Sequence, residues 1–222
     1  MRIITKVLRP LLGTIARPFL DDIPVKGPRS TYNNEESMPG IRRYILEHIQ
    51  NIDRTLLQLE RAGFTISGEK MQLCMPAIDL VGFICDSDGR HPDLTKVSKI
   101  LSWTICGDRR DIRAFLGLIG YFRAHISHHT ILAGPLYELL RKDAPFIWGK
   151  KQQQALDDLK AALAMAAALI TIQYEPNPDT GEIDEIVIIV DASIDGWGAG
   201  LLQIQEGKRR PVRFDSGLWS PI

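Results

Sequence analysis

The stretch IVIIVDASIDGWGAG, residues 186–200, decides the fold of this 222-residue chain. Its first five residues are all apolar, which predicts a buried strand, and the polar residues and glycine that follow predict a tight turn into a second strand. Asp191 would therefore lie at the end of the first strand. Because carboxylates beside turns are common metal ligands, Asp191 is a candidate for one.

A second acidic motif, FLDDIPV, occupies residues 19–25. Burying the adjacent carboxylates of Asp21 and Asp22 would be costly unless a cation or hydrogen-bond donors neutralised them. Mg²⁺ is a hard ion that prefers oxygen ligands, and two carboxylates in a tight turn can hold it. A solvent-exposed Asp-Asp hairpin turn is the alternative that the dipeptide alone leaves open.

Charge is balanced over the whole chain but not along it. The formal net charge is zero, whereas residues 90–150 carry 10 basic and 5 acidic side chains. A basic block of this kind can attract phosphate backbones, and a solvated helical surface is the other interpretation. With 45% apolar and 24% charged residues, the composition is that of an ordinary globular protein.

The cysteines, the apolar runs and the N-terminal sequence indicate the cellular compartment that we expect for this protein. Cys74, Cys85 and Cys106 are widely spaced, so neither a disulfide framework nor a zinc site is predicted. Residues 161–170 are too short an apolar run for a membrane span, and no secretory signal is evident. We expect an intracellular protein, in the cytoplasm or nucleus, with no membrane partner.

Three histidines cluster at His125, His128 and His129. No cysteine or carboxylate lies beside them at ligand spacing, so a metal site is not favoured. The sequence predicts surface histidines in a solvated loop.

Hydrophobic periodicity predicts the remaining elements. Residues 1–12 read as the end of a helix, residues 41–62 as an amphipathic helix capped by Gly63, and residues 64–83 as short strands or a hairpin. A turn is expected at residues 88–92, then a short helix from Val97 and a second capped by Asp108 with Asp111. The buried face of that second helix should hold Ile112, Phe115, Leu116, Ile119 and Phe122. Two further helices are predicted, at residues 132–141 and 150–169.

Several blocks, taken in order, resemble the Pol polyprotein of long-terminal-repeat retrotransposons of the Ty3/gypsy type, and they are most similar in kind to its fungal branch. The block FLDD at residues 19–22 is similar to the aromatic-x-Asp-Asp box of that family's reverse transcriptase. The blocks GFTISGEK at 63–70 and LVGF at 80–83 resemble its hairpin and primer-grip region. The blocks GRHPD at 89–93 and RAFLGLIGYFR at 113–123 resemble its thumb, and the DAS and GWGA motifs at 191–193 and 196–199 resemble the opening hairpin of its RNase H domain.

The resemblance implies roles for individual residues. Asp21, Asp22 and Asp191 would be catalytic residues that bind Mg²⁺, the first two in the polymerase site and the third in the nuclease site. The nucleic-acid-binding residues would be Lys70, Gly82, Lys96, Lys99, Arg109, Arg110, Arg113 and Arg123. The partner would be an RNA/DNA hybrid or a primer–template duplex.

The sequence thus predicts an α+β fold in three parts: the end of a reverse transcriptase palm at 1–88, a helical thumb and connection at 89–170, and a truncated RNase H-like sheet at 171–222. Both metal sites are expected to lack carboxylates that the family uses, so no polymerase or nuclease turnover is expected from the chain alone. Three functions stay open: a piece of a retrotransposon polymerase and nuclease, a non-catalytic nucleic-acid-binding remnant, or a functionless remnant. Exposed strand edges near residues 186–219 are expected to favour aggregation.

Overall fold

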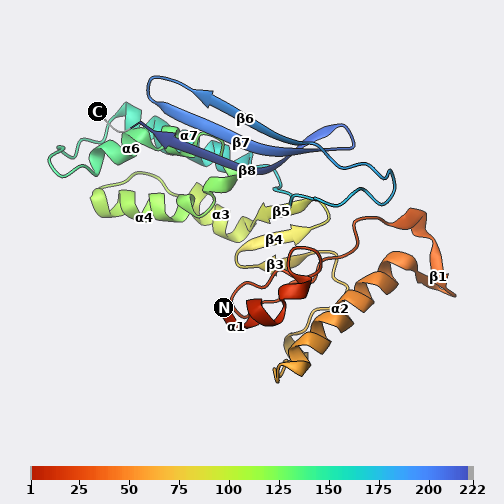
Figure 1. Cartoon of the computed structure of the whole chain (residues 1–222). Coiled ribbons are helices and arrows are strands. Elements are labelled where there is room, and N and C mark those ends of the chain that lie inside the picture. The colour runs from red at the N-terminus through yellow and green to blue at the C-terminus, as the bar shows by residue number, and fades with distance from the viewer. Residues whose placement is uncertain (1, 220–222) are drawn as a thin grey trace. The chain divides into compact units, whose positions relative to one another are not determined.

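The computed structural model describes residues 2–219, which form helices and short antiparallel sheets (Figure 1). The predicted α+β class is confirmed. The chain divides into two compact units: unit 1 is Met1–Pro76 with Glu175–Ile183, and unit 2 is Ala77–Tyr174 with Asp184–Ile222. The predicted boundaries after residues 88 and 170 refer to the subdomains of the resembled family and stay predictions. No helix within residues 2–219 is both long and apolar enough to cross a membrane.

Unit 1 is built around one long helix. Its elements in chain order are α1 (Arg2–Val7), the 3-10 turns η1 (Arg9–Leu11) and η2 (Tyr32–Asn34), the strands β1 (Glu36–Met38) and β2 (Ile41–Arg42), α2 (Arg43–Arg61) and η3 (Gly68–Lys70). A hairpin at residues 15–26 lies between η1 and η2. The small core of the unit consists of Leu8, Leu11, Ala16 and Leu59.

Helix α2 confirms the predicted amphipathic helix and its cap. The amide of Phe64 donates to the carbonyl of Leu59 at 3.0 Å, and that of Gly63 donates to Glu60 at 2.9 Å. These two bonds are the pattern that satisfies the last carbonyls of a helix when a glycine follows it. Phe64 then packs on the cluster that contains Leu59, so the cap also fixes the exit of the chain.

Unit 2 contains two three-stranded antiparallel sheets. The first has the order β3 (Ile78–Leu80), β4 (Phe83–Asp86), β5 (Gly89–Pro92), and the second the order β6 (Ile186–Ala192), β7 (Gly196–Gln205), β8 (Lys208–Leu218). The predicted hairpin within 64–83 is partly right, because β3 pairs with β4, which begins only at Phe83. The predicted turn at 88–92 is wrong. Residues 89–92 form β5, and the turn precedes them where Asp86 accepts the amides of Asp88 and Gly89.

The helices of unit 2 lie between the two sheets in the sequence. They are α3 (Leu94–Leu101), α4 (Arg109–Gly120), the 3-10 turn η4 (Arg123–His125), α5 (His129–Leu132), α6 (Gly134–Leu139) and α7 (Lys150–Ala164). The predicted cap is confirmed, since the Asp108 carboxylate accepts the amides of Arg110 and Asp111 at 2.7 and 2.8 Å. The Asp111 carboxylate instead accepts the amide of Gly107 at 2.9 Å, which ties the preceding loop to the helix.

Two helix predictions are wrong in extent. The sequence predicts one helix at residues 132–141, but the chain makes two short ones, α5 and α6. Pro135 in the first turn of α6 explains the break, because proline lacks an amide hydrogen and favours a helix start. The predicted helix at 150–169 ends at Ala164, and Leu169 instead pairs with Arg90 of β5 through bonds of 2.8 and 3.1 Å.

The segment around Leu169 connects the two sheets of unit 2. Its next residue, Ile170, donates its amide to the carbonyl of Pro211 in β8 at 2.8 Å, so one extended segment bonds to β5 and to β8. Gly89 allows this close approach. A Cβ at that position would lie 2.6 Å from the carbonyl oxygen of Leu169, and the φ of Gly89 is +132°.

The core of unit 2 is formed mainly by α4 and α7. The five residues predicted for the apolar face of α4 are all buried, with Phe122 just beyond its end. From α7 the core receives Leu156, Leu159 and Leu163. Burying one such side chain contributes about 1.5–3 kcal/mol, so this helix pair stabilises the unit much more than its surface contacts do.

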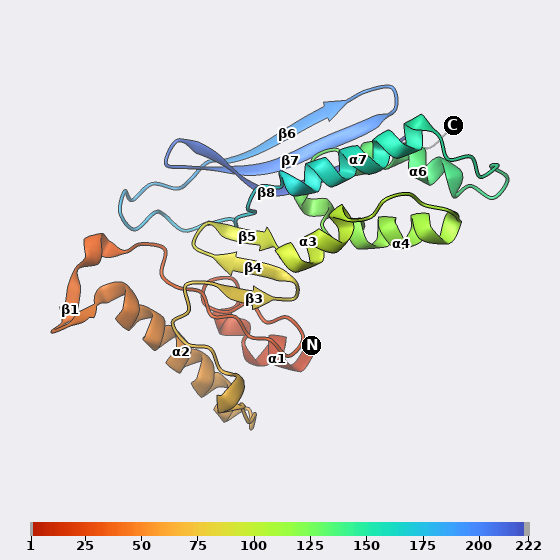
Figure 2. The same cartoon turned by 180° about the vertical axis from the view of Figure 1, so that it is seen from behind.

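The second sheet packs onto the helices through β8, as the contacts of this strand with η4 and α5 show (Figure 2). Thr130 donates its amide to the hydroxyl of Ser216 at 2.8 Å and its hydroxyl to the carbonyl of Ser216 at 2.9 Å. The imidazole of His128 lies directly on Gly198 of β7, where a Cβ would overlap the ring. These contacts attach one side of the sheet to the helical part.

The opposite edge of this sheet is exposed, which corrects the predicted burial of residues 186–190. The strand exists as β6, but the side chains of Ile188 and Val190 are 69% and 72% exposed. The reason is that β6 lies at the edge of the sheet order and pairs only with β7. Sequence periodicity alone does not distinguish a central apolar strand from an exposed edge strand.

The prediction that the three clustered histidines lie at the surface is wrong for two of them. His125 and His129 are buried, with exposed fractions of 3% and 5%, and the Nε2 atoms of both have no hydrogen-bond partner. The ring of His125 stacks on Phe83 at 5.3 Å between centroids. Burial lowers the pKa of His125 to about 4 and also lowers the pKa of His129. The short elements η4 and α5 turn both side chains inward, an arrangement without a sequence period.

Candidate nucleic-acid interface and carboxylate sites

Asp21 and Asp22 lie at the tip of the 15–26 hairpin of unit 1. The amides of Phe19 and Asp22 each donate to the carbonyl of the other residue, at 2.9 and 3.0 Å, which closes a two-residue turn over Leu20 and Asp21. Leu20 has a φ of +55°. Both carboxylates are exposed, so the tip presents them to solvent side by side.

Asp191 lies in β6, two residues before the turn into β7, in register with Gly198. Its side chain is exposed and borders a shallow depression lined by Val190, Ala192, Trp197 and Gly198. Gly198, the residue opposite Asp191, has no side chain, and the imidazole of His128 occupies the space that this leaves. The sequence prediction of a carboxylate at a strand end is therefore right in its location.

The donor chemistry at both places fits Mg²⁺, since carboxylate oxygens are its usual protein ligands. Asp21 and Asp22 would supply two carboxylates, and Asp191 would supply one. Within residues 2–219 no group of three or more His, Cys, Asp or Glu side chains is gathered at metal-binding distance. The described residues therefore bring together two carboxylates at the hairpin tip and one at Asp191.

The glycine predicted to approach a nucleic acid lies in the turn between β3 and β4. Val81 and Gly82 form this two-residue turn with φ angles of +50° and +78°, between the paired residues Leu80 and Phe83. The Lys96 side chain of α3 extends over Gly82, where a Cβ would overlap its ammonium group. The structure thus brings together Gly82 and Lys96, two of the predicted nucleic-acid-binding residues.

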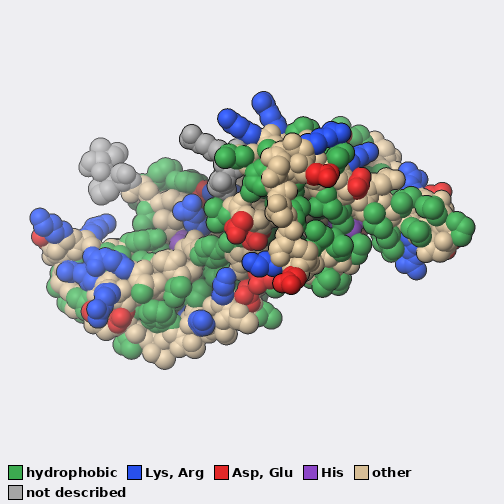
Figure 3. Space-filling model, turned by 90° about the horizontal axis from the view of Figure 1, so that it is seen from below, with side chains coloured by type: hydrophobic (Ala, Val, Ile, Leu, Met, Phe, Trp, Pro, Cys, Tyr) green, Lys and Arg blue, Asp and Glu red, His purple; other side chains and the backbone are tan. Residues whose placement is uncertain are grey.

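The other predicted cations are distributed over three elements of unit 2 and one of unit 1. Lys99 lies three residues after Lys96, on the same side of α3, and Arg110 and Arg113 have the same spacing on α4. All four are exposed. Arg123 is exposed on η4, and Lys70 is exposed on η3 of unit 1. On the face drawn in Figure 3, several Lys and Arg side chains gather over the part of unit 2 that holds α4.

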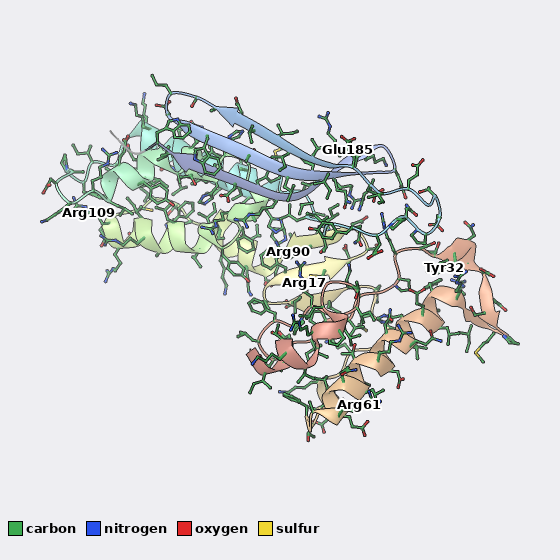
Figure 4. The ribbon with its side chains drawn as sticks, in the orientation of Figure 1. Arg17, Tyr32, Arg61, Arg90, Arg109 and Glu185 are labelled. Atoms are coloured by element: carbon green, nitrogen blue, oxygen red, sulfur yellow. The ribbon has the colours of Figure 1, made fainter. Side chains whose placement is uncertain are left out.

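Arg109 differs from the other predicted cations. Its guanidinium donates to the carbonyl of Leu139 at 2.9 Å and to that of Ala144, and it is only partly exposed (Figure 4). These bonds attach the start of α4 to the loop after α6. Arg109 therefore has a structural role in unit 2, whatever else it binds.

An aromatic group that sequence reasoning missed surrounds the Val81–Gly82 turn. Tyr121 stacks on Phe83 at 5.2 Å between centroids, and its hydroxyl donates to the carbonyl of Val81. The guanidinium of Arg90, also labelled in Figure 4, lies 4.6 Å from the centre of the Phe83 ring. The signal available in the sequence was the Tyr-Phe pair at the end of α4, which periodicity assigns only to the core.

No protein-family model matches this chain. It is 30% identical over 205 residues to the Gag-Pol polyprotein of Gibbon ape leukemia virus, covering 92% of this chain and 11% of that protein. It is 36% identical over 115 residues to the Gag-Pol polyprotein of Avian reticuloendotheliosis virus, covering 51% of this chain and 10% of that protein. With the transposon Tf2-3 polyprotein of Schizosaccharomyces pombe it shares 27% identity over 175 residues, 78% of this chain and 12% of that protein. The chain thus spans about a tenth of the curated relatives it matches.

The solved structures agree on the fold. A foamy viral protease-reverse transcriptase, described in complex with double-stranded DNA, superposes with a TM-score of 0.73 at 19% identity and covers 99% of this chain and 34% of that chain. A second, in complex with an RNA/DNA hybrid, has a TM-score of 0.71 with the same identity and coverage of this chain, and 26% of that chain. The chain is a homologue of retroviral Gag-Pol and Ty3/gypsy-type Tf2 transposon polyproteins, and it corresponds to a region of Pol with a reverse transcriptase and RNase H-like fold.

Proposed function

We propose that unit 2 binds a primer–template duplex or an RNA/DNA hybrid through α3, α4 and the Val81–Gly82 turn. One observation carries the proposal. Exposed cations lie along one side of α3 and along one side of α4, and the same unit contains the Val81–Gly82 turn, which the Lys96 side chain covers. Solved neighbours of the same fold are complexes with double-stranded DNA and with an RNA/DNA hybrid, which supports a duplex as the partner. Lys and Arg contacts to phosphates give affinity without sequence preference, so binding should be general and salt-sensitive.

Within the proposed function, Asp21, Asp22 and Asp191 are Mg²⁺ ligands of the polymerase and nuclease reactions of Pol. When bound, the ion would supply charge stabilisation at the reacting phosphate. The hairpin tip of unit 1 would hold one ion, and Asp191 would hold a second ion at the edge of β6. We further propose that the chain has no turnover by itself. The hairpin tip supplies two carboxylates and the β6 edge supplies one, and each number is smaller than a two-metal displacement uses.

The binding proposal can be tested by fluorescence anisotropy with a labelled RNA/DNA hybrid at several salt concentrations. The double variant Arg110→Gln with Arg113→Gln should weaken binding and reduce the slope of log affinity against log salt by about 2, if each arginine meets one phosphate. Lys150→Gln with Lys151→Gln on α7 is the matched control, since it removes two exposed charges from the same unit. Equal losses in both double variants would contradict the proposed surface.

The same assay separates the alternatives. A non-catalytic binding remnant predicts that affinity is unchanged without Mg²⁺ and in Asp21→Ala, whereas a functionless remnant predicts no binding at physiological salt. Isothermal titration with Mg²⁺ then tests the ligands directly. In the Asp191→Asn background, heat that disappears when Asp21→Asn and Asp22→Asn are added would support the hairpin site, and heat that persists would exclude these two residues as the ligands.

A further inference from the structure

The Val81–Gly82 turn carries backbone strain. Both of its residues have positive φ angles, as a two-residue turn of type I′ requires, and the first is a valine. A β-branched residue rarely adopts this left-handed region, because its side chain crowds the backbone. Asn-Gly is the sequence that suits such a turn, so Val81 persists there only because surrounding contacts hold it.

Four contacts from outside the turn itself hold this conformation. The hydroxyl of Tyr121 donates to the carbonyl of Val81, and the amide of Asp93 donates to the carbonyl of Gly82 at 3.2 Å. The amide of Gly82 donates to the Asp79 carboxylate at 3.3 Å, and the Lys96 side chain covers Gly82. Among these four contacts, only the hydroxyl of Tyr121 bonds to the strained valine.

Tyr121 is suited to this role because its ring is fixed in place. It stacks on Phe83 with an interplanar angle of 23°, and it meets Phe122 edge-on with centroids 5.2 Å apart. Phe122 is buried, so the pair fixes the ring against the core. Tyr121 and Val81 are nevertheless 47% and 37% exposed, which leaves the turn accessible from solvent.

We propose that Tyr121 is a positioning residue that connects the end of α4 to the Val81–Gly82 turn and holds this turn in its duplex-binding conformation. The inference rests on the proposed function, since the duplex is the ligand for which the turn is held. It assigns the hydroxyl group, rather than the aromatic ring, to the connection. The strained valine makes the connection necessary, so relieving the strain should make the hydroxyl dispensable.

The test uses the full chain, three single variants and one double variant, Tyr121→Phe with Val81→Asn. Tyr121→Phe removes the hydroxyl and keeps the ring, Tyr137→Phe removes a hydroxyl from an exposed tyrosine of α6 as the control, and Val81→Asn gives the turn the Asn-Gly sequence. Hydrogen exchange of a peptide spanning residues 78–86 and affinity for an RNA/DNA hybrid are measured for each. Loss of one hydrogen bond predicts roughly a fivefold change in both quantities.

We expect Tyr121→Phe to exchange about fivefold faster and to bind about fivefold more weakly, Tyr137→Phe to change neither, and Tyr121→Phe in the Val81→Asn background to behave as that background does. A purely structural tyrosine would lower stability without the rescue by Val81→Asn. Unchanged exchange in Tyr121→Phe, or an equal loss in both backgrounds, would overturn the inference. If the wild type binds no duplex, the proposed function fails, and the exchange data alone decide whether Tyr121 holds the turn.

Discussion

At the scale of the residue, His125 links the stability of unit 2 to pH. Its ring is buried against Phe83 with an unpartnered Nε2, and desolvation lowers its pKa to about 4, with Arg90 and His91 acting in the same direction. The bond between Nδ1 and the carbonyl of Ala167 opposes this shift only partly. Because the folded pKa lies below the unfolded value of about 6.5, the folded state favours the neutral ring.

We predict that the free energy of unfolding of unit 2 is constant above about pH 7 and falls by on the order of 3 kcal/mol as the pH decreases from 6.5 to 4. Urea titrations followed by tryptophan fluorescence measure this, since Trp103, Trp148, Trp197 and Trp219 all belong to unit 2. His125→Phe should reduce this dependence to the part that buried His129 contributes, whereas His128→Asn, at an exposed position of the same cluster, should preserve it in full. A wild-type free energy that stays level between pH 7 and 5 would show that His125 is not titrating in this way.

At the scale of the element, the segment at Leu169 and Ile170 determines how the two sheets of unit 2 are connected. Gly89→Ala would place a methyl group 2.6 Å from the Leu169 carbonyl, at a φ that side chains rarely adopt. We predict that this variant destabilises unit 2 by about 1–3 kcal/mol in urea titrations. Gly117→Ala in α4, where a Cβ meets nothing within 4 Å, should instead stabilise it by about 0.5–1 kcal/mol. Equal effects of the two variants would argue against the connection at Gly89.

Elements that are determined by local sequence signals could be predicted, whereas elements that depend on distant partners could not. Helices α2 and α4 were predictable because each has a clear apolar period and a local cap, Gly63 and Asp108, that acts within a few residues. The end of α7 was not, because Leu169 leaves the helical pattern to pair with Arg90, a partner distant in the sequence. Non-local pairing of this kind has no period and no local motif.

The residues of the candidate site also fall into those that local motifs locate and those that depend on distant contacts. Motif resemblance located Asp21, Asp22 and Gly82 at turns and Asp191 near a strand end, where the structure has them. It could not indicate that Arg109 bonds to two carbonyls of a distant loop, or that Tyr121 bonds to Val81 forty residues away. Buried His125 and His129 were missed because polar residues in short, irregular elements read as surface.

At the scale of the whole molecule, the exposed edge of β6 bears on solubility. Ile188 and Val190 are mostly exposed on a strand that pairs on one side only, the arrangement that favours edge-to-edge association. We predict that Ile188→Lys with Val190→Lys lowers the self-associated fraction in size-exclusion chromatography with light scattering, with unchanged helical content. Ile147→Lys, at an exposed loop position, is the control for added charge. A similar decrease in the control would mean that charge, rather than the strand edge, governs association.

Unit 1 is discontinuous in the sequence, because the chain returns to it at residues 175–183. There Asp179 accepts the hydroxyl of buried Ser30 at 2.5 Å, and the carbonyl of Glu175 accepts the guanidinium of Arg29. During synthesis, roughly 150 residues must therefore leave the ribosome between the first half of each contact and the second. The first part of unit 1 emerges before unit 2, but these contacts can form only after the helices of unit 2 have been made, so unit 1 cannot be completed in the order of translation.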